Sequence, residues 1–341
     1  SDVCSSDLFQ IDRTALAPVF AAGLFGLMLG ALAFGTIADR VGRKRILVLC
    51  TVWFGVCSLL TARASSVEAL FFWRFLTGLG LGGALPNAIA ITSELSPARV
   101  RATTVMVMFC GFSIGAAIGG VVAAAVMSRY GWAAVFIVGG IGPCVLAGAL
   151  LVGLPSRGLD APHAVSGVPV VQLFTEGRTR TTLLVWLVFF MSLLDLYFVT
   201  NWLPTLLADS GLGVDRAVLV TALFQAGGAA GTLTLGRVFD RLPPFRVLAV
   251  TYVVAAVLVA TIGRVGGSLW MLSATVIGAG FCIVGGQTGA NALTATLYPQ
   301  AIRATGVGWA LGIGRIGSIV GPLAGGLLLS LRWETPDLFF V

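Results

Sequence analysis

A run of about twenty apolar residues ends in the charged stretch Gly35–Arg45 (GTIADRVGRKR), and this feature restricts the possible folds most strongly. The run, from Thr14 to Ala38, has the length of helix that a bilayer core of about 30 Å requires. Asp39 and four basic residues follow at once, as in a helix that ends at a charged turn outside the membrane. A shorter copy, Gly236–Arg241 (GRVFDR), follows 201 residues after the first. Two such copies predict a duplicated membrane protein.

The composition supports a lipid environment. Hydrophobic residues make up 57% of the chain and charged residues 10%, and the mean hydropathy is +0.99, whereas about 25% of the residues of a soluble domain are charged. A net charge of +7 is also compatible with a protein that binds nucleic acid. However, the basic residues lie mainly at the ends of apolar runs, where they orient membrane helices. We therefore expect a lipid bilayer and no nucleic acid as the environment of this chain.

Ten apolar spans are expected, separated by polar turns. In chain order they cover residues 14–38, 46–61, 69–92, 102–127, 132–154, 181–207, 214–235, 245–262, 269–297 and 304–331. The proline-containing polar segment 155–180 is the long linker between two halves. The expected fold is therefore an all-α membrane protein with a polar N-terminal stub at 1–12, an N-terminal bundle at 13–154 and a C-terminal bundle at 181–341.

The basic residues are unevenly divided between the two sides of the membrane. Thirteen of them fall in the turns on one side and six on the other, and the charged residues that remain inside spans are Arg74, Asp195 and Arg315. By the positive-inside rule, the richer side is cytoplasmic. Both charged turns and the linker lie on that side.

The two halves share a period of 201 or 202 residues, which indicates a parallel duplication. The matched pairs are Asp39 with Asp240, Pro97 with Pro299, Arg101 with Arg303, Gly115 with Gly317, Gly119 with Gly321, and Trp132 with Trp333. By this period, the counterpart of span 181–207 would precede residue 7, and the counterpart of span 132–154 would run past residue 341. We therefore expect helices 2 to 11 of twelve, without helix 1 and most of helix 12, and a foreign or truncated stub over about residues 1–8.

Two six-helix halves, a cytoplasmic linker and GTIADRVGRKR together resemble the major facilitator superfamily, whose helix 2–3 loop carries GxxxDRxGRR/K. More narrowly, four stretches resemble the aromatic acid/proton symporter family of the benzoate and 4-hydroxybenzoate type. They are RFLTGLGLGGALPNAIAITSELSPARVRA (74–102), FCGFSIGAAIGG (109–120), NWLPTLL (201–207) and YPQAIRATGVGWALGIGRIGS (298–318). The family's DGxD element would lie in the missing helix 1.

This resemblance implies a monomeric, multi-pass transporter of a bacterial inner membrane, not an enzyme, that imports a small aromatic carboxylate with protons by alternating access. One alternative is a proton-coupled antiporter of drugs or metabolites, although such antiporters carry GPxxGG in helix 5 and the proline is absent before Gly119-Gly120. Another alternative is a transporter-like sensor without flux. The cysteines are scattered and His163 is the single histidine, so we expect no metal site and no cofactor.

Asp39 and Asp240 are the candidate gating residues. A carboxylate at the end of one helix can cap the positive N-terminus of another, and the resemblance implies that Asp39 caps helix 11 near Ala301–Thr305 and that Asp240 caps helix 5. We expect these contacts to close the cytoplasmic side. The further residues of this expected network are Arg40, Gly42, Arg43, Arg241, Glu94 and Arg101. The alternative for the basic residues is that they only set the topology.

Arg315 is the strongest candidate for substrate binding, because a charge near the middle of a span needs a partner or a function. Its planar guanidinium matches a carboxylate. The alternative is a structural ion pair with Asp195. Asp195 could instead carry a proton between charged and neutral forms. On a helical wheel Trp202 shares the face of Asp195, whereas Tyr197 points about 200° away.

Three amide side chains complete the expected substrate site. Gln287 and Asn291 lie one helical turn apart, and they could bind the ring or the carboxylate of a substrate or form a polar seam between helices. Asn87, beside Pro86, has the same two alternatives. Arg74 lies within two turns of the periplasmic end of its span, so it could reach water. The resemblance ties an arginine at its position to proton transfer.

Overall fold

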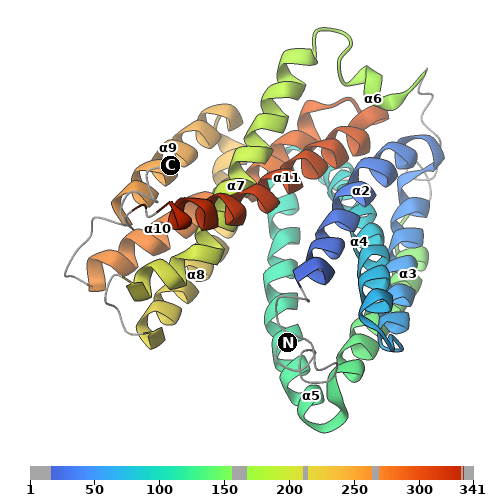
Figure 1. Ribbon diagram of the computed structural model, residues 1–341. Helices are drawn as coiled ribbons and strands as arrows, with labels where there is room; N and C mark the ends of the chain where they lie inside the picture. The colour runs from blue at the N-terminus through green and yellow to red at the C-terminus, as the bar shows by residue number, and fades with distance from the viewer. Residues whose placement is uncertain (1–16, 156–166, 210–213, 263–268, 332, 334–341) are drawn as a thin grey trace. The chain divides into compact units, whose positions relative to one another are not determined.

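The computed structural model describes residues 17–155, 167–209, 214–262, 269–331 and 333, and these form helices without any strand. The stub at 1–12, His163 and the end of the chain lie outside the described residues. The long helices are α2 (Ala17–Val41), α3 (Arg43–Thr61), α4 (Val67–Leu95), α5 (Arg101–Gly153), α7 (Thr179–Asp209), α8 (Val214–Arg241), α9 (Pro244–Ile262), α10 (Leu269–Leu297) and α11 (Arg303–Ser330). Short elements are η2 (Ala98–Val100), α6 (Pro169–Gln172) and η3 (Gln300–Ile302) (Figure 1).

The helices match the ten expected spans within a few residues. Within the described parts of the chain, nine helices are long and apolar enough to cross a membrane. Two expected spans, 102–127 and 132–154, are joined as the single element α5, but Gly131 interrupts it with φ 75° and ψ −179°. The chain turns back at this point (Figure 1). The prediction of an all-helical membrane protein is therefore confirmed.

The chain divides into two compact units that do not coincide with the two halves of the sequence. Unit 1 comprises 1–91, 114–182 and 295–312, and unit 2 comprises 92–113, 183–294 and 313–341. Each unit thus takes the N-terminal part of one helix from the other half of the sequence. For unit 1 this is the start of α11, and for unit 2 it is the start of α5.

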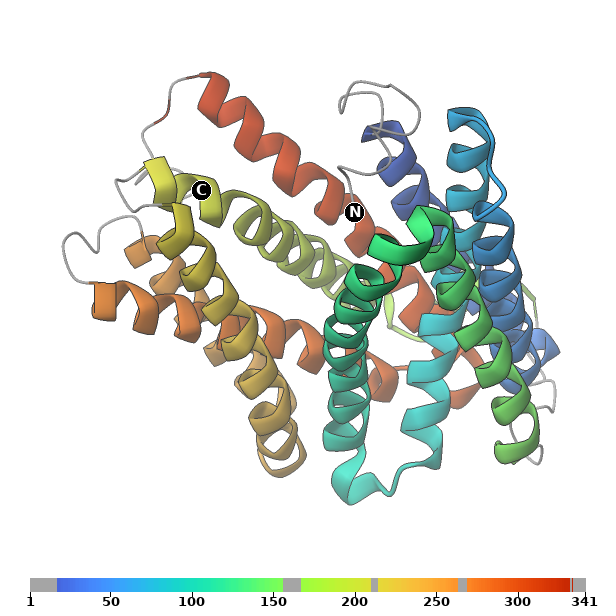
Figure 2. The same cartoon turned by 90° about the horizontal axis from the view of Figure 1, so that it is seen from below.

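In unit 1, α2, α3 and α4 run side by side (Figure 2). Small residues allow this approach: a Cβ atom on Gly30 would meet the carbonyl oxygen of Leu79, and one on Gly83 would lie 2.6 Å from the sulfur of Cys50. A buried cluster of Ala38, Ile46, Cys50, Ala90 and Ala304 joins α2, α3, α4 and the start of α11. The cysteines in this region therefore act as small core residues, as free Cys commonly does.

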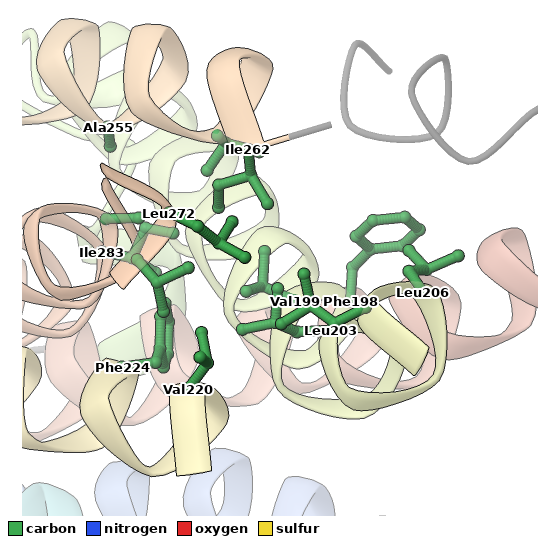
Figure 3. Close-up of a cluster of buried hydrophobic side chains, with 14 of the residues drawn as sticks. Phe198, Val199, Leu203, Leu206, Val220, Phe224, Ala255, Ile262, Leu272 and Ile283 are labelled. Atoms are coloured by element: carbon green, nitrogen blue, oxygen red, sulfur yellow. The ribbon is translucent and has the colours of Figure 1, made fainter. Parts of the chain in front are cut away.

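Unit 2 has the larger apolar core, to which α7, α8, α9 and α10 all contribute. Its members shown in Figure 3 are Phe198, Val199, Leu203, Leu206, Val220, Phe224, Ala255, Ile262, Leu272 and Ile283. Several of these side chains, such as Val199 and Ile283, are fully buried. This core fixes the relative positions of the helices that carry the charged and amide side chains described below.

A glycine stripe on α11 holds α7 at close range within unit 2. A Cβ atom on Gly317 would fall on the carbonyl oxygen of Phe190, and one on Gly321 on that of Leu194. This is the packing that a small-residue stripe permits in membranes. The corresponding residues of α5, Gly115 and Gly119, have no described atom within 4 Å of an added Cβ.

Candidate functional site

The carboxylate of Asp39 caps the N-terminus of α11 within unit 1. It accepts hydrogen bonds from the main-chain N–H of Ala304 at 3.3 Å, and from the N–H and hydroxyl of Thr305 at 2.7 Å each. Arg43 adds two more bonds from Nε and Nη2, at 3.0 and 2.8 Å, and also donates to the carbonyl oxygen of Gln300. The side chains of Asp39 and Arg43 are both 0% exposed. The contact expected between Asp39 and the start of helix 11 is thus present.

Asp240 makes the corresponding contact within unit 2. Its carboxylate accepts hydrogen bonds from the N–H groups of Ala102 and Thr103, at 2.9 Å each, and from the Thr103 hydroxyl at 2.6 Å. Pro244 stands four residues after Asp240, where Arg43 stands four residues after Asp39. Asp240 is also only half-buried. The two caps therefore share their geometry but differ in charge balance.

The other residues of the expected gating network have different surroundings. Gly42 separates α2 from α3 with φ 112° and ψ 132°, a conformation that favours glycine. Arg40 is exposed and donates to the carbonyl oxygen of Gly167 in the linker at 2.6 Å. Glu94 and Arg101 are half-buried, and Arg241 is exposed. The structure thus brings Arg43 directly to Asp39, while Arg40 contacts the linker instead.

In unit 2, Arg315 points to α7 and binds Tyr197. Its Nη1 donates to the Tyr197 hydroxyl oxygen at 2.8 Å. Its buried Nε has no hydrogen-bond partner among the described residues. Arg315 also forms no ion pair with Asp195, although the structure describes both residues. The structure therefore does not contain the alternative, a structural ion pair between Arg315 and Asp195.

The hydrogen bond to Tyr197 determines which edge of the guanidinium remains available. A guanidinium can bind a carboxylate in bidentate fashion through two parallel N–H groups. Tyr197 occupies Nη1, so the remaining edge is the one formed by Nε and Nη2. A half-buried cation without a counter-ion in the described part of its unit is costly in a membrane unless an anion joins it. This edge can accept one carboxylate.

Asp195 lies with α9 rather than with Arg315. Tyr252 of α9 donates to the hydroxyl of Ser192 at 2.9 Å, and Ser192 precedes Asp195 by one helical turn. Asp195 thus lies one turn along α7 from a hydrogen bond to α9, and the structure shows no ion pair between it and Arg315.

Tyr197 is the residue that sequence reasoning missed. The wheel placed it away from Asp195, but its long side chain spans the short gap to α11 that Gly317 and Gly321 create. Trp202, which the wheel favoured, also faces α11, and its Nε1 donates to the carbonyl oxygen of Pro322 at 3.0 Å. The glycine stripe of α11 was the available signal, because it identifies the helix that α7 approaches most closely.

Gln287 and Asn291 are buried on α10, with exposed fractions of 6% and 3%. The side-chain oxygens Oε1 of Gln287 and Oδ1 of Asn291 have no hydrogen-bond partner among the described residues. An unpaired buried acceptor costs about 1 to 3 kcal/mol. These amides are therefore able to accept hydrogen bonds from a bound molecule in unit 2.

The two remaining candidates, Asn87 and Arg74, belong to α4 in unit 1. Asn87 is fully buried; its Nδ2 donates to the carbonyl oxygen of Gly83 at 2.7 Å, and its Oδ1 has no partner among the described residues. The guanidinium of Arg74 lies 6.0 Å from the centre of the Phe136 ring, within the range of a cation–π contact. Both candidates thus belong to unit 1, whereas Arg315, Asp195, Gln287 and Asn291 belong to unit 2.

Known proteins match this chain over most of its length. The model of the Major Facilitator Superfamily matches residues 5–322. The "4-hydroxybenzoate transporter PcaK" of Pseudomonas aeruginosa is 40% identical, over 95% of this chain and 80% of the relative. The "3-(3-hydroxy-phenyl)propionate transporter" of Escherichia coli K12 is 41% identical, over 96% and 81%.

A solved structure supports the same fold. The human organic anion transporter MFSD10 (TETRAN) superimposes with a TM-score of 0.75 over 96% of this chain and 80% of that chain, at 18% identity. At this identity the likeness concerns the fold alone. Together with the family match, this superposition confirms a transporter fold. The matched family and the relatives are transporters and not enzymes. The chain belongs to the major facilitator superfamily.

Proposed function

We propose that this protein imports a small aromatic carboxylate, together with protons, across a bacterial inner membrane by alternating access. The single observation that carries the proposal is the free Nε–Nη2 edge of Arg315, a half-buried cation that is held by Tyr197 and has no carboxylate partner in the described part of unit 2. The aromatic class is supported by the relatives named for 4-hydroxybenzoate and 3-(3-hydroxy-phenyl)propionate.

Asp195 is the proposed proton carrier of this cycle. It lies one helical turn from Ser192, which binds Tyr252, and does not pair with Arg315, so its charge is free to change without removing the partner of the substrate-binding cation. Arg74 is a second proposed participant in proton transfer, in unit 1. The polar linker is proposed to lie on the cytoplasmic side, and the protein to act as a monomer.

The two capping carboxylates are the proposed cytoplasmic gate. Asp39 ties α2 to α11, and Asp240 ties α8 to α5, each through a threonine and main-chain N–H groups. Opening toward the cytoplasm would require these hydrogen bonds to break, so substrate binding must favour the state without them by a comparable free energy. Arg43 would then retain Asp39 as its partner within the same turn.

Uptake of labelled 4-hydroxybenzoate into membrane vesicles tests the proposal. An imposed pH gradient, outside acidic, should drive accumulation above equilibrium, and a proton ionophore should abolish it. Accumulation driven by a gradient of the opposite sign would support the antiporter instead. If the protein neither accumulates nor exchanges any aromatic acid, the proposal is overturned. Binding of such an acid without flux would then favour the sensor.

A further inference from the structure

The amides of Gln287 and Asn291 form a buried pair of acceptors that no described side chain uses. They are separated by four residues on α10, so they lie on one face, one turn apart. Both residues are more than nine-tenths buried, and both amide oxygens are inaccessible to water and without a partner in the described structure. A protein rarely leaves two adjacent buried acceptors unsatisfied without a reason.

The other faces of α10 are occupied by neighbouring helices. Gly289 lies against the Phe239 ring of α8, and the hydroxyls of Thr288 and Thr232 are 3.3 Å apart. Gly286 lies against Tyr252 of α9, where an added Cβ would be 3.2 Å from the ring. On a helical wheel, Gln287 and Asn291 lie about 160° from Gly289, whereas Val284, which packs on Gly228 of α8, lies close to their face. At the level of Gly289 their side chains therefore point away from the Phe239 ring.

Gln287 and Arg315 lie at a similar distance along their helices from the turn that joins α10 to α11. α10 ends at Leu297 and α11 begins at Arg303, so the connecting turn places these two helix ends at one level. Gln287 precedes its helix end by ten residues and Arg315 follows its helix start by twelve, which corresponds to about 15 and 18 Å of helix rise. The two residues thus stand at comparable levels of their helices.

The chemistry of the two sites determines how an aromatic acid would be oriented. A carboxylate has only acceptor oxygens and suits the N–H edge of Arg315, whereas amide oxygens require a donor. A ring hydroxyl is a neutral donor that can satisfy them. We infer that Gln287 and Asn291 form a subsite for a ring hydroxyl group and make the protein selective for hydroxylated aromatic acids. This inference rests on the proposed function.

The competing explanation is a polar seam in which the amides only stabilise the helix packing. The two explanations differ in what substitution does to different acids. If the amides form only a seam, substituting them lowers the stability and weakens the binding of all acids equally. If they form a hydroxyl subsite, substituting them weakens the binding only of acids that carry the hydroxyl. The ratio of two affinities separates them, because a general loss of folding cancels in the ratio.

Calorimetry on the purified protein, with 4-hydroxybenzoate and benzoate as probes, measures this ratio. We expect the wild-type protein to bind 4-hydroxybenzoate roughly tenfold more tightly, because a buried acceptor is satisfied only by that acid. In the Gln287→Met/Asn291→Leu variant the ratio should fall to about one, with benzoate affinity retained. Thr275→Val, at a half-buried position on the same helix where the hydroxyl donates to the carbonyl oxygen of Met271, should keep the wild-type ratio.

Three other outcomes would count against the inference. A double variant that keeps the tenfold ratio would overturn the subsite while leaving the proposed function intact. If the variant bound both acids more weakly by the same factor and had a lower unfolding temperature, the amides would be assigned to a polar seam. Wild-type protein that binds neither acid would overturn the proposed function itself. The single variants Gln287→Met and Asn291→Leu provide the same comparison if the double variant does not fold.

Discussion

Asp39 accepts two hydrogen bonds of 2.7 Å from Thr305, one from the main-chain N–H and one from the hydroxyl. The two residues are 266 positions apart in the chain, and their contact joins α2 of the first half to α11 of the second within one compact unit. The same arrangement of a carboxylate and a threonine recurs between Asp240 and Thr103. The duplication therefore extends from the sequence to individual hydrogen bonds.

The two caps should differ in their contribution to stability. Asp39→Ala leaves the buried Arg43 without its carboxylate, so we expect a loss of about 3 kcal/mol in the free energy of unfolding. Asp240→Ala should cost about 1 kcal/mol, since Asp240 is half-buried and has no arginine one turn later. Thermal unfolding of the purified variants in detergent measures the difference. Equal losses would contradict the role assigned to Arg43, and Asp39→Ala/Arg43→Met should recover part of the loss.

The glycine stripe of α11 should be intolerant of even one methyl group. An added Cβ at Gly317 would fall on the carbonyl oxygen of Phe190, so we expect Gly317→Ala to destabilise this chain by about 2 kcal/mol. Gly115→Ala, at the equivalent position of α5, meets no described atom within 4 Å and should change the stability by less than about 0.5 kcal/mol. The unfolding temperatures of the Gly317→Ala and Gly115→Ala variants measure this difference in stability. A smaller effect at Gly317 would mean that α7 can move away from α11.

The turn between α2 and α3 depends on the backbone of Gly42. At φ 112° and ψ 132° a residue with a Cβ atom is strained, and we expect Gly42→Ala to cost about 2 kcal/mol. Gly148→Ala is the matched control, because that glycine lies within a helix and an added Cβ meets nothing within 4 Å. Thermal unfolding of both variants tests this. If Gly42→Ala were as stable as the control, the turn would have to adopt another conformation.

Tyr197 should strengthen the binding of the substrate carboxylate by holding the guanidinium of Arg315 in place. Removal of its hydroxyl in Tyr197→Phe releases Nη1, and the loss of one hydrogen bond of about 1 kcal/mol weakens 4-hydroxybenzoate binding roughly fivefold. Arg315→Lys keeps the charge but loses the planar fork, so it should weaken binding more than Tyr197→Phe does. Calorimetry measures both variants, with the exposed Tyr130→Phe as control. Unchanged binding in Arg315→Lys would exclude the bidentate contact.

Asp195 should be needed for coupling rather than for binding. Asp195→Asn cannot release a proton, so we expect exchange of 4-hydroxybenzoate across vesicle membranes to continue while accumulation driven by a pH gradient is lost. The control Glu176→Gln removes an exposed carboxylate of the linker, whose ion pair with Arg178 lies outside the proposed site. Parallel exchange and accumulation assays distinguish the two steps. Full accumulation in Asp195→Asn would assign proton transfer to another residue.

The sequence by itself determined the helices and their order. Apolar runs of membrane-spanning length must satisfy their backbone hydrogen bonds internally, so in lipid they can only form helices or a closed barrel, and the expected spans agree with the structure within a few residues. The sequence period also identified Asp39 and Asp240 as equivalent positions before any contact was known. Such features depend on residue type and spacing along one segment.

Only the tertiary structure decided which side chains meet. The sequence did not distinguish an ion pair between Arg315 and Asp195 from separate roles, because a helical wheel gives the direction of a side chain and not the distance to the next helix. The close approach of α7 and α11 brought Tyr197 to Arg315, and the structure shows no ion pair between Arg315 and Asp195. The unpaired state of the amide oxygens of Gln287 and Asn291 likewise depends on how α8 and α9 pack against α10, which no single segment encodes.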